Sequence, residues 1–131
     1  MGAAMGPVEQ AIRANFKPPV TLCTLAQRKP FQISVIDSRG IVLLLGIQES
    51  PVRLPWECLE SIPAFLRSQP GWVPAGGAHS VEGEPGTVDE FLKGWVKTDV
   101  ARWLACVLRD AGIVEVVDGP LRLRPTQARV W

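Results

Sequence analysis

The strongest constraint on the fold is a series of local signals between residues 87 and 125. Thr87 and Glu90 form a capping box, in which the Thr hydroxyl accepts the backbone N–H of Glu90 and begins a short helix that ends near Gly94. Thr98 or Asp99 then caps a longer helix. An apolar stripe runs along that helix at intervals of three and four residues, at Val100, Trp103, Leu104, Val107, Leu108 and Ala111.

A β-hairpin is expected after these helices. Residues 113–117 are rich in valine and have the composition of a strand. Asp118-Gly119 is a strong signal for a two-residue hairpin turn. On the return strand, Arg122 and Arg124 are two residues apart, so both side chains point to the same face.

The first half of the chain predicts a helix, a small antiparallel meander and a second helix. The first helix covers residues 7–16, because Pro7 suits a first helical turn. The three strands of the meander are expected at residues 31–37, 41–45 and 52–54. Trp56 lies at the start of the second helix, which Pro63 is expected to kink or to split in two.

Residues 73–86 are rich in proline and glycine, which is typical of a loop or linker. We therefore expect an α+β protein with a meander lobe over residues 1–75, a connector over 76–86 and a helix-and-hairpin lobe over 87–131. In the alternative interpretation, the helix that begins at Trp56 belongs to the C-terminal lobe, and the two lobes are one unit.

Composition excludes several classes of protein. The 131 residues are 47% hydrophobic and carry a net charge of +1, which is not typical of a disordered chain. The longest apolar run, residues 41–45, is far shorter than the roughly 20 residues of a membrane span. The cysteines are widely spaced and His79 is the single histidine, so we expect no metal and no cofactor. The sequence predicts a reduced, cytoplasmic protein without a catalytic site.

Residues 87–125 resemble the end of a winged helix-turn-helix, with TVDEFLKGW as the supporting helix, KTDVARWLACVLRDAG as the second and IVEVVDGPLRLRP as the wing. A complete winged helix has another helix before these two, and the one that starts at Trp56 is available for that place. The meander, PWECLESIPAFL and the winged-helix-like lobe together are similar to the N-terminal DNA-reading domains of bacterial HNH-type restriction endonucleases that target modified DNA.

The resemblance implies that the second helix enters the major groove and exposes Ala101, Arg102, Ala105 and Arg109. Arg102 is then the best candidate for a guanine contact, because its guanidinium matches the two acceptors of that base. The complete set of expected DNA contacts is Lys97, Thr98, Arg102, Arg109, Arg122, Arg124, Arg28, Lys29 and Arg39. Candidates for stacking on a base are Trp72, Trp95 and His79.

Each of these residues also has an ordinary structural interpretation. Arginines on an edge hairpin often serve only to prevent aggregation, and tryptophans at the ends of elements often close a loop over the core. Asp99 and Asp110 flank the second helix and would repel phosphate.

We therefore expect a module that binds double-stranded DNA, methylated DNA included, as the target reader of a larger nuclease or regulator. The nuclease domain would lie in the same longer chain or in a partner. Affinity would come mainly from contacts of Lys and Arg with phosphates. The alternative is a protein-interaction domain that uses a winged-helix scaffold to bind a partner at a hydrophobic groove, which the near-neutral charge favours.

Overall fold

The computed structural model describes residues 5–24, 28–76, 86–97, 99–118 and 120–126. Within these residues the fold is α+β, as the sequence predicts, with helices and two antiparallel sheets. In chain order the elements are α1 (Pro7–Asn15), β1 (Val20–Cys23), β2 (Pro30–Ile36), β3 (Gly40–Leu45), β4 (Ser50–Pro55), α2 (Trp56–Arg67), β5 (Val73–Pro74), α3 (Val88–Leu92), α4 (Ala101–Asp110), β6 (Val114–Val117) and β7 (Arg122–Pro125).

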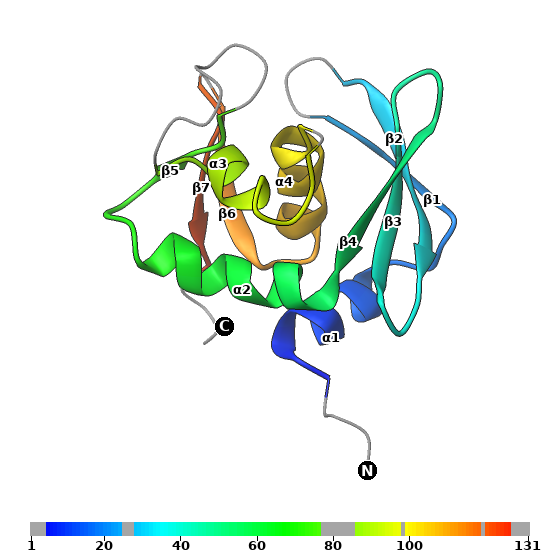
Figure 1. The fold of residues 1–131 in the computed structure, drawn as a ribbon, viewed down its shortest axis with the longest axis horizontal. Helices are drawn as coiled ribbons and strands as arrows, with labels where there is room; N and C mark the ends of the chain where they lie inside the picture. The colour runs from blue at the N-terminus through cyan, green and yellow to red at the C-terminus, as the bar shows by residue number, and fades with distance from the viewer. Residues whose placement is uncertain (1–4, 25–27, 77–85, 98, 119, 127–131) are drawn as a thin grey trace.

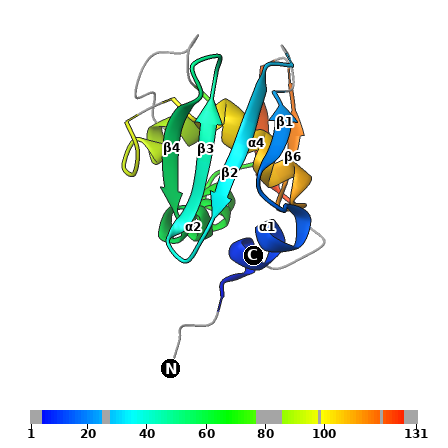
Figure 2. The same cartoon turned by 90° about the vertical axis from the view of Figure 1, so that its right-hand side faces the viewer.

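The larger sheet is a meander in the order β1-β2-β3-β4 (Figure 2). The predicted strands correspond to β2, β3 and β4, whereas β1 was not predicted, because four residues are too few to establish a period. One face of this sheet is buried and carries Phe31, Ile33, Ile41, Leu43 and Leu54. The sheet must therefore be covered on that side by other elements.

The smaller sheet has the order β5-β7-β6. β5 is only two residues long and pairs antiparallel with β7, with Val73 opposite Leu123 and Pro74 opposite Arg122. These two residues were predicted to belong to a loop. That prediction is wrong for them because a strand is created here by a partner from the far end of the chain, which local composition does not reveal.

One hydrophobic core joins both halves of the chain. Val8 of α1, Ile41 of the larger sheet, Leu59 of α2, Leu104 of α4 and Leu123 of β7 belong to a single buried cluster. α2 packs against β7, and α4 packs against both β6 and β1. Figure 1 shows α4 enclosed between the two sheets. The two lobes expected from the sequence therefore share a core, and residues 77–85 of the connector lie outside the described residues.

The starts of the two C-terminal helices have different causes. The predicted cap of α3 is confirmed, because the Thr87 hydroxyl accepts the backbone N–H of Glu90 at 3.1 Å. The predicted cap of α4 is wrong: its N-cap is Val100, which offers no side-chain hydrogen bond. Asp99 instead accepts the ammonium group of Lys93 at 2.6 Å. Val100 is fully buried, so core packing fixes where α4 begins.

Pro63 does not split α2, which is continuous from Trp56 to Arg67. Proline removes one intrahelical hydrogen bond. However, Leu59, Ile62 and Leu66, on both sides of Pro63, are all buried in the same core. Their packing holds the two turns together, so the predicted division into two helices is wrong.

Candidate interaction surface

α4, the helix expected to enter DNA, is covered on the side that the sequence interpretation left exposed. Ala101 is 2% exposed and Ala105 is fully buried, so the prediction that both face solvent is wrong. Trp103 contacts Phe31 of β2 edge to face, with ring centroids 5.4 Å apart. The larger sheet, which has an apolar face of its own to bury, therefore contacts α4 on the side of Trp103, a residue that the sequence places on the apolar stripe.

The predicted basic contacts do not form one surface. Arg28 and Lys29 lie in the β1–β2 connection and Lys97 lies in the α3–α4 connection, both at the end of the molecule where α4 begins (Figure 1 and Figure 2). Arg39 lies in the β2–β3 turn at the opposite end, and Arg109 is in the last turn of α4.

Of the four other predicted positions, two belong to the described residues. Arg102 is half-buried on α4. Trp95, in the α3–α4 connection, is 44% exposed. Thr98 and His79 lie outside the described residues.

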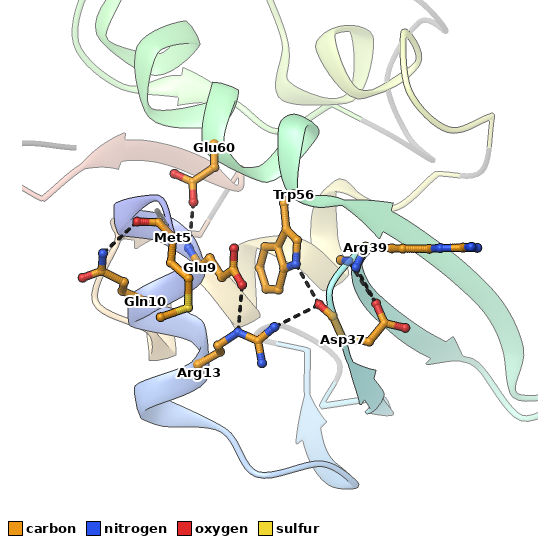
Figure 3. A network of polar contacts seen from close by, with 9 residues as sticks. Met5, Glu9, Gln10, Arg13, Asp37, Arg39, Trp56 and Glu60 are labelled. Carbon is orange, nitrogen blue, oxygen red and sulfur yellow. Dashed lines mark hydrogen bonds and ion pairs between the residues drawn. The ribbon is translucent and has the colours of Figure 1, made fainter. Parts of the chain in front are cut away.

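A polar network at the β2–β3 turn connects α1, α2 and the larger sheet (Figure 3). The carbonyl of Asp37 accepts Nη2 of Arg13 at 3.0 Å and Nε1 of Trp56 at 2.8 Å. Its carboxylate accepts both terminal nitrogens of Arg53, at 3.1 and 3.2 Å. The hydrogen bond from Arg53, followed by that from the backbone N–H of Arg39, lowers the pKa of Asp37 to about 2. These contacts are internal, so we assign the network to stability.

Three of the predicted contact residues do come together, on the outer face of the smaller sheet. The register places Arg122 opposite both Pro74 and Val117, and Arg124 opposite Glu115. Residues directly opposite one another point to the same side of a sheet. The side chains of this outer face, called the small-sheet face below, are Trp72, Pro74, Glu115, Val117, Arg122 and Arg124.

Arg124 is held between two neighbours on the small-sheet face. Its Cζ lies 4.3 Å from the centroid of the Trp72 ring, which is a cation–π contact. Its Nε donates to the carboxylate of Glu115. The charge of Arg124 is therefore compensated within the chain, and a phosphate would have to compete with Glu115 for it.

Arg122 has no such compensation. Its Nε is buried and has no hydrogen-bond partner among the described residues. The side chain as a whole is half-buried. A guanidinium stays protonated throughout the pH range of proteins. Among the described residues, Arg122 therefore adds a guanidinium whose Nε has no acceptor on the small-sheet face.

The hairpin register decides which arginine meets Glu115. A two-residue turn at Asp118-Gly119 would place Arg122 opposite Glu115, but Val117 pairs with Arg122 and leaves four residues, 118–121, between the strands. The predicted two-residue turn is therefore wrong. The physical reason is Pro120, which has no N–H to close the shorter turn.

Trp72 and the two arginines were identified separately from the sequence, but their convergence and the role of Glu115 were not. The convergence depends on β5, whose two residues carry no periodic signal. One feature of the sequence indicates a role for Glu115: it lies on the predicted strand that pairs with the strand carrying Arg122 and Arg124 in the same hairpin. The register would still have been needed to find its partner.

No known protein family, curated protein or solved structure matches this chain. Within the described ranges, no three His, Cys, Asp or Glu side chains are grouped to hold a metal ion. Across the same residues, every helix is too short or too polar to cross a membrane.

Proposed function

We propose that this chain is a protein-interaction module on a winged-helix-like scaffold, without catalytic activity of its own. The burial of α4 is the observation that carries the proposal. Ala101 and Ala105, which a DNA-reading helix of this family would expose, are buried here, and Trp103 of the same helix packs against Phe31 of the larger sheet. Separating the two would expose Phe31 and Trp103, at roughly 1.5–3 kcal/mol for each large side chain.

The order of elements supports the scaffold. α2 supplies the additional helix that a complete winged helix has before the two helices of the C-terminal segment, and it packs against β7. The hairpin of β6 and β7 follows α4, as the wing does in that family. In this interpretation the larger sheet is an addition to the winged-helix scaffold that packs against the recognition helix at Trp103.

The small-sheet face is the surface we assign to the partner. Tryptophan and arginine are enriched among the residues that dominate protein–protein binding energy. Duplex DNA presents a negative charge about every 1.7 Å along its axis. A protein surface that binds it tightly therefore needs several Lys or Arg side chains that are free to contact phosphates. On this face Arg124 is already paired with Glu115, and within the described part of the chain Arg122 is the other cation, with no acceptor at its Nε. This charge pattern favours a protein over a nucleic acid.

DNA binding is the competing function, and a salt comparison separates the two. We expect the chain to bind duplex DNA, methylated or not, no more tightly than a Kd of roughly 10⁻⁴ M at about 50 mM salt. Tight binding that weakens steeply toward about 200 mM salt would refute the proposal. The double variant Arg122→Ala plus Arg124→Ala is the control for contacts through the wing.

A positional crosslinking experiment tests the protein partner directly. A photoreactive amino acid replaces Pro74, which is exposed on the small-sheet face, or Glu57, which is exposed on α2. We expect a crosslink to one protein from position 74 and none from position 57. The crosslinked protein is then purified and its affinity for the unmodified chain is measured. Equal labelling from both positions, or no affinity between the purified proteins, would contradict the proposal.

A further inference from the structure

β1 is an outer strand of the larger sheet, and its outward backbone groups are open to another chain (Figure 2). Residue pairs that exchange hydrogen bonds alternate along an antiparallel ladder with pairs that do not. The N–H of Thr24 donates to the carbonyl of Lys29 at 2.9 Å, so the alternation turns the N–H and C=O of Leu22 toward β2 as well. Thr21 and Cys23 therefore turn their N–H and C=O away from the sheet. Both residues are exposed, and on that side neither makes a hydrogen bond to a described residue.

The opposite edge of the larger sheet is obstructed by prolines. The N–H of Trp56 donates to the carbonyl of Arg39 at 3.1 Å, and the register of β4 then turns Pro51, Arg53 and Pro55 outward. Proline has no N–H to offer a further strand, and proteins commonly protect sheet edges in this way. A strand added to β4 would therefore lack most of its hydrogen bonds from the sheet.

The two edges of the smaller sheet are also less accessible than β1. β5 turns Pro74 outward, because its neighbour Ala75 donates its N–H to the carbonyl of Leu121. β6 turns Val114 and Val116 outward, and Val114 is only 2% exposed. Among the described strands, β1 is therefore the edge most open to a further strand.

We propose that β1 binds an extended, acidic segment of another protein, which adds to the larger sheet as an antiparallel strand. This site is separate from the small-sheet face. Strand addition gains affinity from main-chain hydrogen bonds and specificity from alternate side chains. Thr21 and Cys23 together offer two donors and two acceptors on the outward side, which a segment of about five residues can satisfy.

The charge around β1 indicates that the added segment is acidic. From residue 10 to residue 36 the sequence contains no Asp or Glu. Lys17 lies exposed before β1, and Arg28 and Lys29 lie exposed after it. In an antiparallel pair of two β1 strands, these cations would approach the same cations of a second copy and repel them. Carboxylates on the added segment would instead be attracted to both ends of β1.

The two faces of β1 indicate how acidic and apolar residues alternate in the segment. Val20 and Leu22 are partly buried against the core, whereas Thr21 and Cys23 lie on the other face and are exposed. A residue of an added strand points to the same face as the residue opposite it. The site therefore fits apolar side chains beside Val20 and Leu22, and carboxylates opposite Thr21 and Cys23.

The test uses a blocked pentapeptide of alternating valine and glutamate, with valine at both ends, as the probe. Its binding to the ¹⁵N-labelled full chain is followed through the backbone amide signals and their hydrogen exchange. We expect saturable shifts of the Thr21 and Cys23 amides, and exchange of both that is about tenfold slower or more when the peptide is bound.

Two N-methylated versions of the peptide test the backbone pairing. Methylation of both glutamate nitrogens removes the N–H groups that would face β1, and should weaken binding about tenfold or more. Methylation of the central and last valine nitrogens removes N–H groups that would face away from β1, and should leave binding within about threefold of the unmodified peptide.

Variants of the chain locate the site. Thr21→Pro removes one outward N–H without removing a hydrogen bond to β2, and should weaken the peptide about tenfold. The double variant Lys17→Gln plus Lys29→Gln should weaken the glutamate peptide about threefold or more, and leave the corresponding glutamine peptide unaffected. Arg67→Gln, at an exposed position on α2, is the control and should bind as the wild type does. The backbone spectrum of each variant shows whether its fold is intact.

Several results would overturn the inference. They are the absence of a shift with peptide at about 5 mM, which would detect a Kd near 1 mM, equal affinity for the two methylated peptides, and equal affinity for a peptide with lysine in place of glutamate. Slower exchange of Thr21 and Cys23 at rising concentrations of the chain alone would make a second copy the occupant, and tighter binding of single-stranded DNA at these residues would make it a nucleic acid. The crosslink from position 74 tests the small-sheet face alone, so the proposed function can stand when this inference fails.

Discussion

Replacing Glu60 by alanine is expected to loosen the N-terminal helix, although Glu60 lies in α2. Its carboxylate accepts the backbone N–H of Val8 at 3.1 Å and that of Glu9 at 2.9 Å (Figure 3). The N-cap of α1 is Gly6, which has no side chain to accept these donors. Glu60 therefore performs from a distant part of the sequence the role that an N-cap side chain usually performs.

The magnitude follows from the two bonds and the charge. Loss of an N-cap acceptor costs about 1 kcal/mol. A carboxylate at the positive end of a helix dipole adds up to about 1 kcal/mol more. We therefore expect Glu60→Ala to lower the free energy of unfolding by about 2 kcal/mol. Val8 and Ile12 of α1 are fully buried in the shared core, so the loss reaches global stability and not only the helix end.

Gly6 provides an internal check on this reasoning. A Cβ at position 6 would overlap the Glu60 carboxylate, so Gly6→Ala must displace it and is expected to cost a similar amount. The backbone of Gly6 has φ −69°, which alanine adopts without strain. In the Glu60→Ala background, Gly6→Ala should therefore be neutral or stabilising by about 0.5 kcal/mol.

Urea unfolding of the wild type, the two single variants and the double variant measures the coupling. Glu57→Ala, at an exposed position in the first turn of α2, is the control and should change stability by less than about 0.5 kcal/mol. The reasoning is refuted if Glu60→Ala is as stable as the control, or if the effects of Gly6→Ala and Glu60→Ala add.

Three further predictions concern the core, the acid response and the thiols. Phe31→Ala should lower the free energy of unfolding by about 3–5 kcal/mol in thermal or urea unfolding, because the ring packs against Trp103; a loss below about 1 kcal/mol would mean that the larger sheet does not cover α4. The pKa of Asp37 is about 2 in the folded chain and 3.8 ordinarily, so its ionised form stabilises the fold above about pH 4 and this contribution is lost as the pH falls toward 2. Stability measured from pH 5 to pH 2 should therefore fall less in Asp37→Asn than in the wild type, and parallel curves would contradict the assignment. Burial raises the pKa of the Cys58 thiol to about 12, so a thiol reagent at pH 8 should label exposed Cys23 rapidly and Cys58 only after unfolding.

Local signals were sufficient to predict several elements. The Thr87 capping box, the stripe along α4 and the strands β2, β3 and β4 all correspond to observed structure. Each of these signals lies within one element, where side-chain spacing and backbone hydrogen bonds act between near neighbours. The predicted two-residue turn is wrong for a local reason, because Pro120 has no N–H to close it.

Long-range pairing produced what the sequence interpretation missed. β5 exists because β7 pairs with it, and that pairing brings Trp72 to Arg124. The cap of α1 is similar, since its acceptor, Glu60, is contributed by another helix. Neither contact has a signature in the composition of its own segment.

By itself the sequence determined which segments become helices and strands and which of their faces are strongly apolar. Only the tertiary structure decided what lies over α4, because alanine is compatible with both a solvated and a buried position. Ala101 and Ala105 are buried, and Trp103 of the same helix packs against Phe31 on the apolar face of the larger sheet. The helix that resembles a DNA reader is thus enclosed, and the small-sheet face is the surface that we propose for a partner.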